Sequence, residues 1–176
     1  PSGNVGIGTT NPSEKLYIEN STNSTDVGMT IANTGSAGGE DALINLYAHA
    51  SGGDPAVRWN ITGTESWTMG IDNSDSDKLI ISNDSTVHGT PRMTFSGANV
   101  AIAADLDPGS DSTYDLGSNS LRWANVYTGD LHLANTDGND IDGTKGDWTI
   151  QEGDEHLFIK NNKTGKKYKF ALEEVE

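Results

Sequence analysis

Apolar residues recur at every second position in short runs along this chain of 176 residues. Successive side chains of a β-strand point to opposite faces of a sheet, so this alternation indicates strands with one apolar face. Clusters of Gly, Asn, Asp and Ser separate the runs, and these residues favour turns. The pattern predicts an all-β chain of short strands and many turns. The main runs are Val27, Met29 and Ile31; Val57, Trp59 and Ile61; Trp67, Met69 and Ile71; Met93 and Phe95; Val100 and Ile102; Leu157 and Ile159; and Tyr168, Phe170 and Leu172.

The composition excludes several classes of protein. Gly, Thr, Asp, Ser and Asn make up 88 of the 176 residues, and their preference for caps and turns is incompatible with a helix bundle. The chain has no run of 18 apolar residues, which argues against membrane insertion. It has no Cys, so it is neither a disulfide scaffold nor a thiolate metal site. A formal net charge of −15 argues against nucleic acid as a partner.

The thin apolar faces predict assembly. A net charge this high with only 33% hydrophobic residues is also found in disordered chains, but the ordered alternation favours strands. Each predicted strand supplies only two or three apolar residues on one face, which is little for a monomeric sandwich. We therefore expect an elongated, intertwined homotrimeric fibre that buries these faces between chains. The alternatives are a monomeric sandwich and an array of small β-modules.

Three segments are expected along the chain. Residues 2–8 (SGNVGIG) recur in altered form as residues 96–103 (SGANVAIA), which predicts a β-fibre module over 1–95 and a second, divergent module over 96–143. The first 143 residues carry 19 acidic and 5 basic residues, whereas the last 33 carry 7 and 6. This change of charge predicts a boundary near residue 143. Residues 144–176 are expected to form a small C-terminal β-meander with a hairpin turn at 163–166.

Three segments also resemble tail fibres of tailed bacteriophages. Residues 3–16 (GNVGIGTTNPSEKL) resemble a segment common in these fibres, residues 70–79 (GIDNSDSDKL) resemble another, and residues 111–127 resemble the segment that precedes their C-terminal end. The three occur in the order that the family uses. Residues 146–174 are similar to the C-terminal ends of marine-phage structural proteins. Many such fibres end in an endosialidase-type chaperone domain, for which the 49 residues after Tyr127 are too few.

The resemblance implies a non-enzymatic virion structural protein. It would be an extracellular part of a tail fibre, with itself, other virion tail or capsid proteins and a host cell-surface glycan or protein as partners. One alternative is an architectural head or neck fibre, or a decoration protein, that binds no receptor. A lesser alternative is a glycan-degrading tailspike. No cofactor is expected.

The glycine motif suggests a trimer axis. In Gly6-Ile7-Gly8 an apolar side chain lies between two residues without side chains, so three backbones could approach one another there. The axis residues expected from both copies of the motif are Val5, Ile7, Val100 and Ile102. The alternative is that Gly6 and Gly8 form a bulge or turn within one chain.

Candidate sites for chemistry are weak. Asp72, Asp75 and Asp77 lie in a turn-rich stretch whose oxygens suit Ca²⁺, but their spacing is not that of an EF-hand. A second such stretch contains Asp137, Asp140 and Asp142. The four histidines lack any metal-binding spacing and are interpreted as surface or strand residues: His49, His88, His132 and His156. No catalytic residue is predicted.

Two further groups have alternative interpretations. Trp59 and Trp67 could stack on sugar rings, but they follow the apolar alternation, so we expect them in the core. Five lysines cluster around the terminal hairpin: Lys160, Lys163, Lys166, Lys167 and Lys169. They form a possible polyanion-binding patch, or they keep an exposed sheet edge soluble. The receptor-contacting residues are left unassigned.

Overall fold

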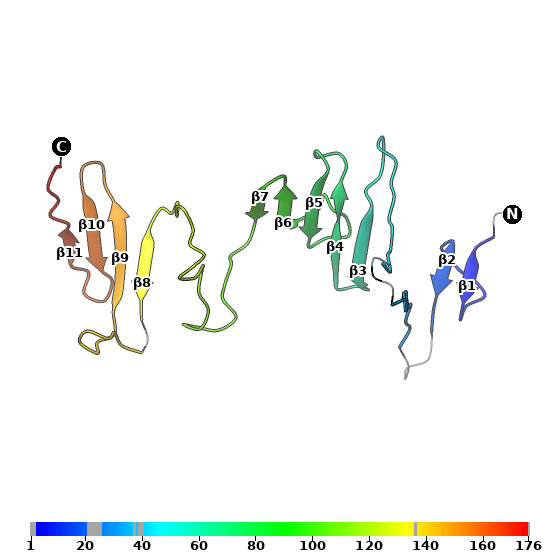
Figure 1. Cartoon of the computed structure of the whole chain (residues 1–176), viewed down its shortest axis with the longest axis horizontal. Coiled ribbons are helices and arrows are strands. Elements are labelled where there is room, and N and C mark those ends of the chain that lie inside the picture. Colours follow the sequence, from blue (N-terminus) through cyan, green and yellow to red (C-terminus); the bar gives the residue numbers. More distant parts are fainter. Residues whose placement is uncertain (1–2, 21–25, 37, 39–40, 136, 176) are drawn as a thin grey trace. The chain divides into compact units, whose positions relative to one another are not determined.

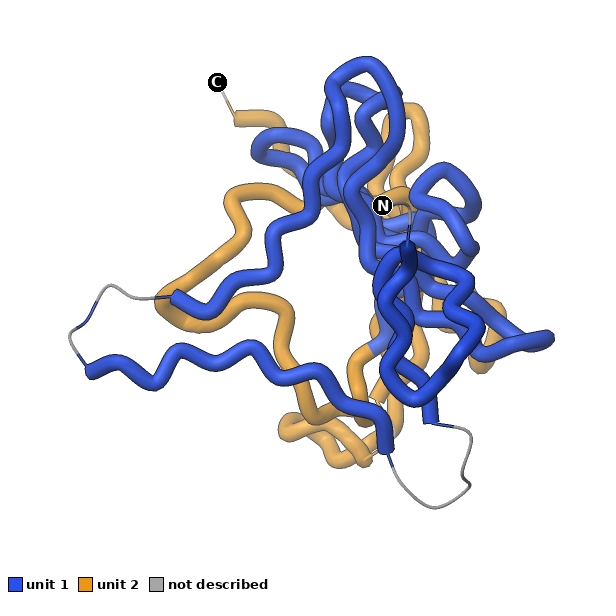
Figure 2. Tube along the Cα trace, turned by 90° about the vertical axis from the view of Figure 1, so that its right-hand side faces the viewer, with its two compact units in different colours: residues 1–107 blue, residues 108–176 orange. Residues whose placement is uncertain are grey.

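The computed structural model describes residues 3–20, 26–36, 38, 41–135 and 137–175. Every regular secondary-structure element in these residues is a β-strand (Figure 1). The chain divides into two compact units, residues 1–107 and 108–176, which Figure 2 colours blue and orange. The predicted all-β class is confirmed. The described residues contain no helix of the length and hydrophobicity that crossing a bilayer requires.

A small parallel sheet opens the first unit. Strand β1 (Val5–Ile7) pairs with β2 (Leu16–Ile18). Gly8 follows β1 with φ +83°, and a Cβ there would collide with the carbonyl oxygen of Glu19. A Cβ on Gly6 would lie 2.6 Å from the carbonyl oxygen of Thr9. Both glycines are therefore required by the loop within one chain, as the alternative reading of the motif expected.

A five-stranded antiparallel sheet forms the main part of the first unit. Its strands follow one another as a meander in the order β3-β4-β5-β6-β7 (Figure 1). Their bounds are β3 Ala56–Ile61, β4 Glu65–Asp72, β5 Lys78–Ser82, β6 Pro91–Ser96 and β7 Asn99–Ile102. Four of the alternating runs lie in β3, β4, β6 and β7, as predicted.

The run of Val27, Met29 and Ile31 was wrongly predicted as a strand. No strand occurs in the described residues 26–36. Within the described part of 26–48, no backbone amide donates to a backbone carbonyl of another described residue. A strand exists only when its backbone groups find a neighbouring strand, and alternation alone does not supply that neighbour.

The second unit ends in a four-stranded antiparallel sheet of order β11-β10-β9-β8. The bounds are β8 Leu131–Ala134, β9 Asp147–Glu152, β10 Leu157–Asn161 and β11 Lys167–Lys169. The turn between β10 and β11 closes through Gly165, whose φ is +71° and whose amide donates to the carbonyl of Asn161 at 2.8 Å. Antiparallel strands occur where the C-terminal meander was predicted, and β8 adds a fourth. Strand β11 ends at Lys169, so Phe170 and Leu172 of the predicted run lie outside it.

Strand pairing continues across both predicted module boundaries. The predicted boundary between residues 95 and 96 lies within β6, which pairs with β7. The predicted boundary between residues 143 and 144 lies between β8 and β9, which also pair with each other. The division between the two compact units falls instead between residues 107 and 108. The division into three modules, which rests on the repeated motif and on the change of charge, stays a prediction.

Candidate functional site

One face of the five-stranded sheet is almost entirely apolar and open. Residues paired across neighbouring strands point to the same face, and the register therefore places the alternating apolar residues of all five strands together. None of them is buried. We call this surface the apolar face; its residues are Val57, Trp59, Ile61, Trp67, Met69, Ile71, Leu79, Ile81, Met93, Phe95, Val100 and Ile102.

The prediction that Trp59 and Trp67 lie in the core is wrong for the single chain. They are directly opposed across β3 and β4, and their exposed fractions are 55% and 38%. They follow the alternation because they belong to the apolar face, yet no described residue of the first unit covers that face.

The opposite face of the sheet is the one that the chain itself covers. Residues 83–90, between β5 and β6, lie against it. The Thr68 hydroxyl donates to the carbonyl of Asp84 at 2.8 Å, and the Thr90 amide donates to the Ser82 hydroxyl at 3.0 Å. Ile80 and Val87 are the buried hydrophobic residues of the described chain, with exposed fractions of 3% and 1%. The buried interior is thus very small and lies on the polar side of the sheet.

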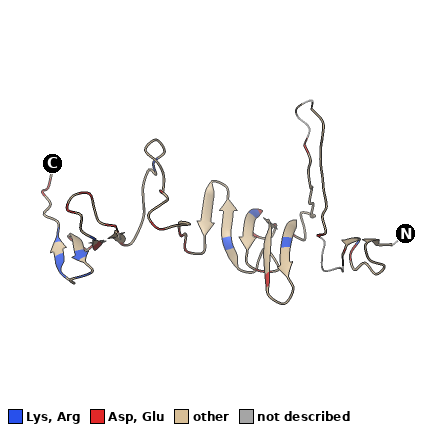
Figure 3. Cartoon of the chain, turned by 90° about the horizontal axis from the view of Figure 1, so that it is seen from below, with Lys and Arg blue, Asp and Glu red and all other residues tan. Residues whose placement is uncertain are grey.

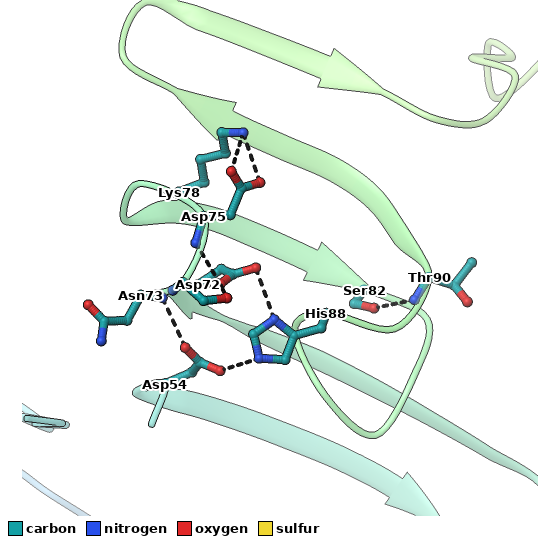
Figure 4. A network of polar contacts seen from close by, with 9 residues as sticks. Asp54, Asp72, Asn73, Asp75, Lys78, Ser82, His88 and Thr90 are labelled. Atoms are coloured by element: carbon teal, nitrogen blue, oxygen red, sulfur yellow. Dashed lines mark hydrogen bonds and ion pairs between the residues drawn. The ribbon is translucent and has the colours of Figure 1, made fainter. Parts of the chain in front are cut away.

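His88 fastens this covering loop to the sheet. Its ring lies between two carboxylates, with Nδ1 3.0 Å from Asp72 Oδ2 and Nε2 2.7 Å from Asp54 Oδ2 (Figure 4). When the imidazole is protonated, both N–H groups donate to these oxygens. Asp72 ends β4, Asp54 precedes β3, and His88 belongs to the loop, so the bridge joins three segments. We call it the His88 bridge.

The charges in the His88 bridge are mutually stabilising. The hydrogen bond to Asp72 raises the pKa of His88 above its ordinary value of 6.5, and the two carboxylate charges act in the same direction. The pKa of Asp72 lies below 3.8, chiefly because the Ser74 side chain donates to its carboxylate, with His88 as a further cause. The folded chain therefore favours the imidazolium form of His88 more than an unperturbed histidine would.

Among the described residues, the same three form a cluster of side chains that could in principle ligate a metal ion. The atoms of Asp54, Asp72 and His88 lie within 4.8 Å of one another. Both ring nitrogens face carboxylate oxygens, however, so the arrangement suits an imidazolium paired with two anions better than a metal ion, which needs a free nitrogen lone pair.

The calcium candidates have other partners. Asp72 accepts hydrogen bonds from Ser74 and from the amide of Asp75, and Asp75 forms a bidentate contact with Lys78 at 2.8 Å. Asp77 adopts a φ of 56° in the same turn. The carboxylates of Asp72 and Asp75 thus act in a turn and an ion pair, and Asp77 contributes its backbone conformation to the turn.

The second acidic stretch also forms a turn. Asp142 accepts from the amide and the hydroxyl of Thr144 at 3.0 and 2.8 Å, and from Asn139 at 2.7 Å. The backbone hydrogen bond from Thr144 is the chief reason that the pKa of Asp142 is lowered. No contact of Asp142 with Asp137 or Asp140 accompanies these bonds among the described residues.

The C-terminal sheet repeats the division into two faces. Register places Leu131, Leu133, Trp148, Ile150, Ile159 and Tyr168 on one face. The other face carries Thr149, Gln151, Phe158, Lys160 and Lys167. Lys160, Lys167 and Lys169 lie on β10 and β11, while Lys163 and Lys166 lie in the connecting turn (Figure 3). The five lysines are therefore split between one sheet face and a turn.

The residues expected at a trimer axis lie in two different sheets. Val5 and Ile7 belong to β1, and Val100 and Ile102 to β7. All four are exposed, with exposed fractions of 41% to 58%. The axis itself stays a prediction.

Comparisons with protein families, with curated proteins and with solved structures found no match. The function therefore has to be argued from the chain's own residues and their arrangement.

Sequence reasoning missed two groupings. His88 was interpreted as isolated because its partners lie 16 and 34 positions away, and no spacing rule connects them. Phe158 and Gln151 were not singled out because they become neighbours of Lys160 and Lys167 only when β9, β10 and β11 pair. In the sequence, the signal that pointed to this part of the C-terminal sheet was the cluster of lysines around the hairpin.

Proposed function

We propose that this chain is a non-enzymatic structural subunit of a bacteriophage tail fibre, which assembles as an elongated, intertwined homotrimer and attaches the virion to a host-surface glycan. The observation that carries the proposal is the apolar face, which is left open although the chain covers the polar side of the same sheet. A large exposed apolar patch marks an interaction surface.

The surface area supports assembly. The chain exposes 15004 Å², whereas a globular protein of its mass exposes about 8,200 Å², and two separate globules the size of its units about 10,000 Å². The difference is several times the roughly 800 Å² that each partner buries in a standard interface. Assembly with identical chains is the simplest way to bury this surface, because each copy then covers the apolar faces of the others.

The order of the three tail-fibre-like segments supports the virion assignment. Residues 3–16 end in β2, residues 70–79 include the turn between β4 and β5, and residues 111–127 precede β8. Attachment follows from this resemblance, and several fibres engaging together would supply avidity to a modest single site.

Sedimentation equilibrium and a glycan array test the proposal together. The assembled protein should have about three times the 18.6 kDa mass of one chain, and it should bind a subset of cell-surface glycans. A stable, folded monomer would contradict the trimer. A trimer that binds no glycan but binds a capsid or baseplate protein would indicate an architectural fibre instead, and release of new reducing ends from host polysaccharide would indicate a tailspike.

A further inference from the structure

The polar face of the C-terminal sheet contains a hollow of about 390 Å³. Its lining includes Asp130, Gln151, Glu152, Phe158, Lys160 and Lys167, and we call it the lysine pocket. The volume lies within the range of small-ligand sites, about 300–1,000 Å³. The lining combines cations, carboxylates, an amide and one aromatic ring, which is an unusual mixture for a surface strand pair.

Two lysines of this pocket lie directly opposite each other. Lys160 and Lys167 pair across β10 and β11, and like charges in that position destabilise a sheet. Among the residues that the structure describes, neither ammonium has an ion-pair or hydrogen-bond partner, although the sequence contains 26 acidic residues. A bound anion between the two ammonium groups would offset their repulsion.

Phe158 supplies a flat apolar surface beside the lysines. It is the large apolar residue of this otherwise polar face, and 39% of it is exposed. The ring is held at its edge: a Cβ on Gly153 would lie 2.6 Å from Phe158 Cε2, and the His156 ring lies edge-on at 6.0 Å. Such a held, half-exposed ring suits contact with the C–H face of a sugar.

The remaining polar groups limit the ligand's charge. Gln151 Nε2 donates to Asp130 Oδ2 at 2.8 Å, which leaves the amide oxygen free to accept from a hydroxyl. Asp130 can accept from further hydroxyl groups, but its negative charge repels a densely charged polyanion. Glu152 is paired with Leu157, so its side chain lies on the other face of the sheet. The pocket therefore suits a hydroxyl-rich ring that carries a single negative group.

The larger hollow of the first unit lacks this complementarity. It measures about 570 Å³ beside the turn between β3 and β4, and several of its polar groups already bond one another. The Asn83 amide donates to Glu65 at 2.7 Å, and the Ser66 hydroxyl donates to Asn60 at 2.7 Å. It offers no aromatic ring and no cation.

We propose that the lysine pocket binds an acidic saccharide, a sugar ring bearing a carboxylate. Lys160 and Lys167 hold the carboxylate, Phe158 stacks on the ring, and the amide oxygen of Gln151 accepts from a hydroxyl. The inference rests on the proposed attachment function and names the class of glycan that this function would use.

The test compares two double variants of the full chain with equal changes in charge. K160Q/K167Q removes the two cations of the pocket, whereas K163Q/K166Q removes two lysines of the neighbouring turn that do not line it. Each protein is applied to an array of uronic-acid, sulfated and neutral oligosaccharides, and the affinity for a galacturonic-acid tetrasaccharide is then measured by calorimetry. Circular dichroism and sedimentation check that fold and mass match the parent protein.

We expect the parent protein and K163Q/K166Q to bind the uronic-acid oligosaccharide alike, and K160Q/K167Q to bind it at least tenfold more weakly, since each charge-assisted hydrogen bond contributes about 1.5–3 kcal/mol. F158L, which keeps the apolar volume without the flat ring, should also weaken binding.

Several outcomes would overturn the inference. If K160Q/K167Q binds glycans as the parent does, or if sulfated glycans bind as tightly as uronic acids, the lysine pocket is not a selective site, while attachment stands. If only neutral glycans bind, the same conclusion holds. If no glycan binds at all, both this inference and glycan attachment are wrong.

Discussion

At the scale of single residues, His88 has the most demanding environment in the described chain. It is 48% exposed at the side chain, yet both of its ring nitrogens face carboxylates, and one of these, Asp72, is 5% exposed. The bridge ties the loop that covers the sheet to the ends of two strands. A change in the protonation of His88 is therefore expected to weaken the contacts that hold the loop over the buried residues Ile80 and Val87.

Replacing His88 by Gln should destabilise the fold in a pH-dependent way. The raised pKa of His88 means that its contribution is complete below about pH 6.5 and is lost as pH rises through the folded-state pKa. The lowered pKa of Asp72 means that its contribution is present above about pH 3.8 and is lost as pH falls. The difference in melting temperature between parent and H88Q should thus be largest between these limits and shrink in alkali.

H49Q is the matched control, because His49 contacts Ser51 two positions away in an exposed turn. Its melting temperature should differ from the parent's by a small amount at every pH. A difference for H88Q that stays constant from pH 5 to pH 9 would contradict the charged bridge.

At the scale of strands, the alternation of apolar and polar residues predicted a strand correctly where one face of that strand is apolar and the other is polar. It located β3, β4, β6, β7 and β10. It missed β5, where Leu79, Ile80 and Ile81 are consecutive, because Ile80 is buried on the covered side while its neighbours belong to the apolar face. The pattern also failed at residues 27–31, which have no strand partner among the described residues.

A charge on the apolar face should prevent assembly without unfolding the sheet. In W59E the carboxylate would be buried by a neighbouring chain, and an unpaired buried charge costs several kcal/mol, so association should weaken by more than tenfold. Because Trp59 is half exposed in the single chain, the β-sheet signal in circular dichroism should persist. Sedimentation velocity would measure the shift to monomer.

The control for this variant is N60E. It adds the same charge one position along β3, where the side chain points to the other face of the sheet. The mass of its assembly should equal the parent's. Equal loss of assembly in both variants would argue against the apolar face as the interface.

At the scale of the whole molecule, stability should depend on protein concentration. Because the described chain buries so little apolar surface by itself, contacts between chains are expected to add to its stability. The melting temperature of an oligomer rises with concentration by mass action. A hundredfold dilution should therefore lower the melting temperature measurably, read by circular dichroism; a temperature that does not move would indicate a self-sufficient monomer or an assembly that dissociates only irreversibly.

The sequence by itself determined the all-β class, the positions of most strands and the C-terminal meander, because alternation and turn chemistry are properties of neighbouring residues. It also showed that each sheet would have an apolar side. Only the tertiary structure decided which side the chain covers. The Thr68 hydroxyl donates to the loop at the Asp84 carbonyl, and the loop's Thr90 amide donates to Ser82. Together with the His88 bridge to Asp72, these bonds hold residues 83–90 on the polar side. The apolar side is thereby left open, an outcome that depends on contacts between residues far apart in the sequence.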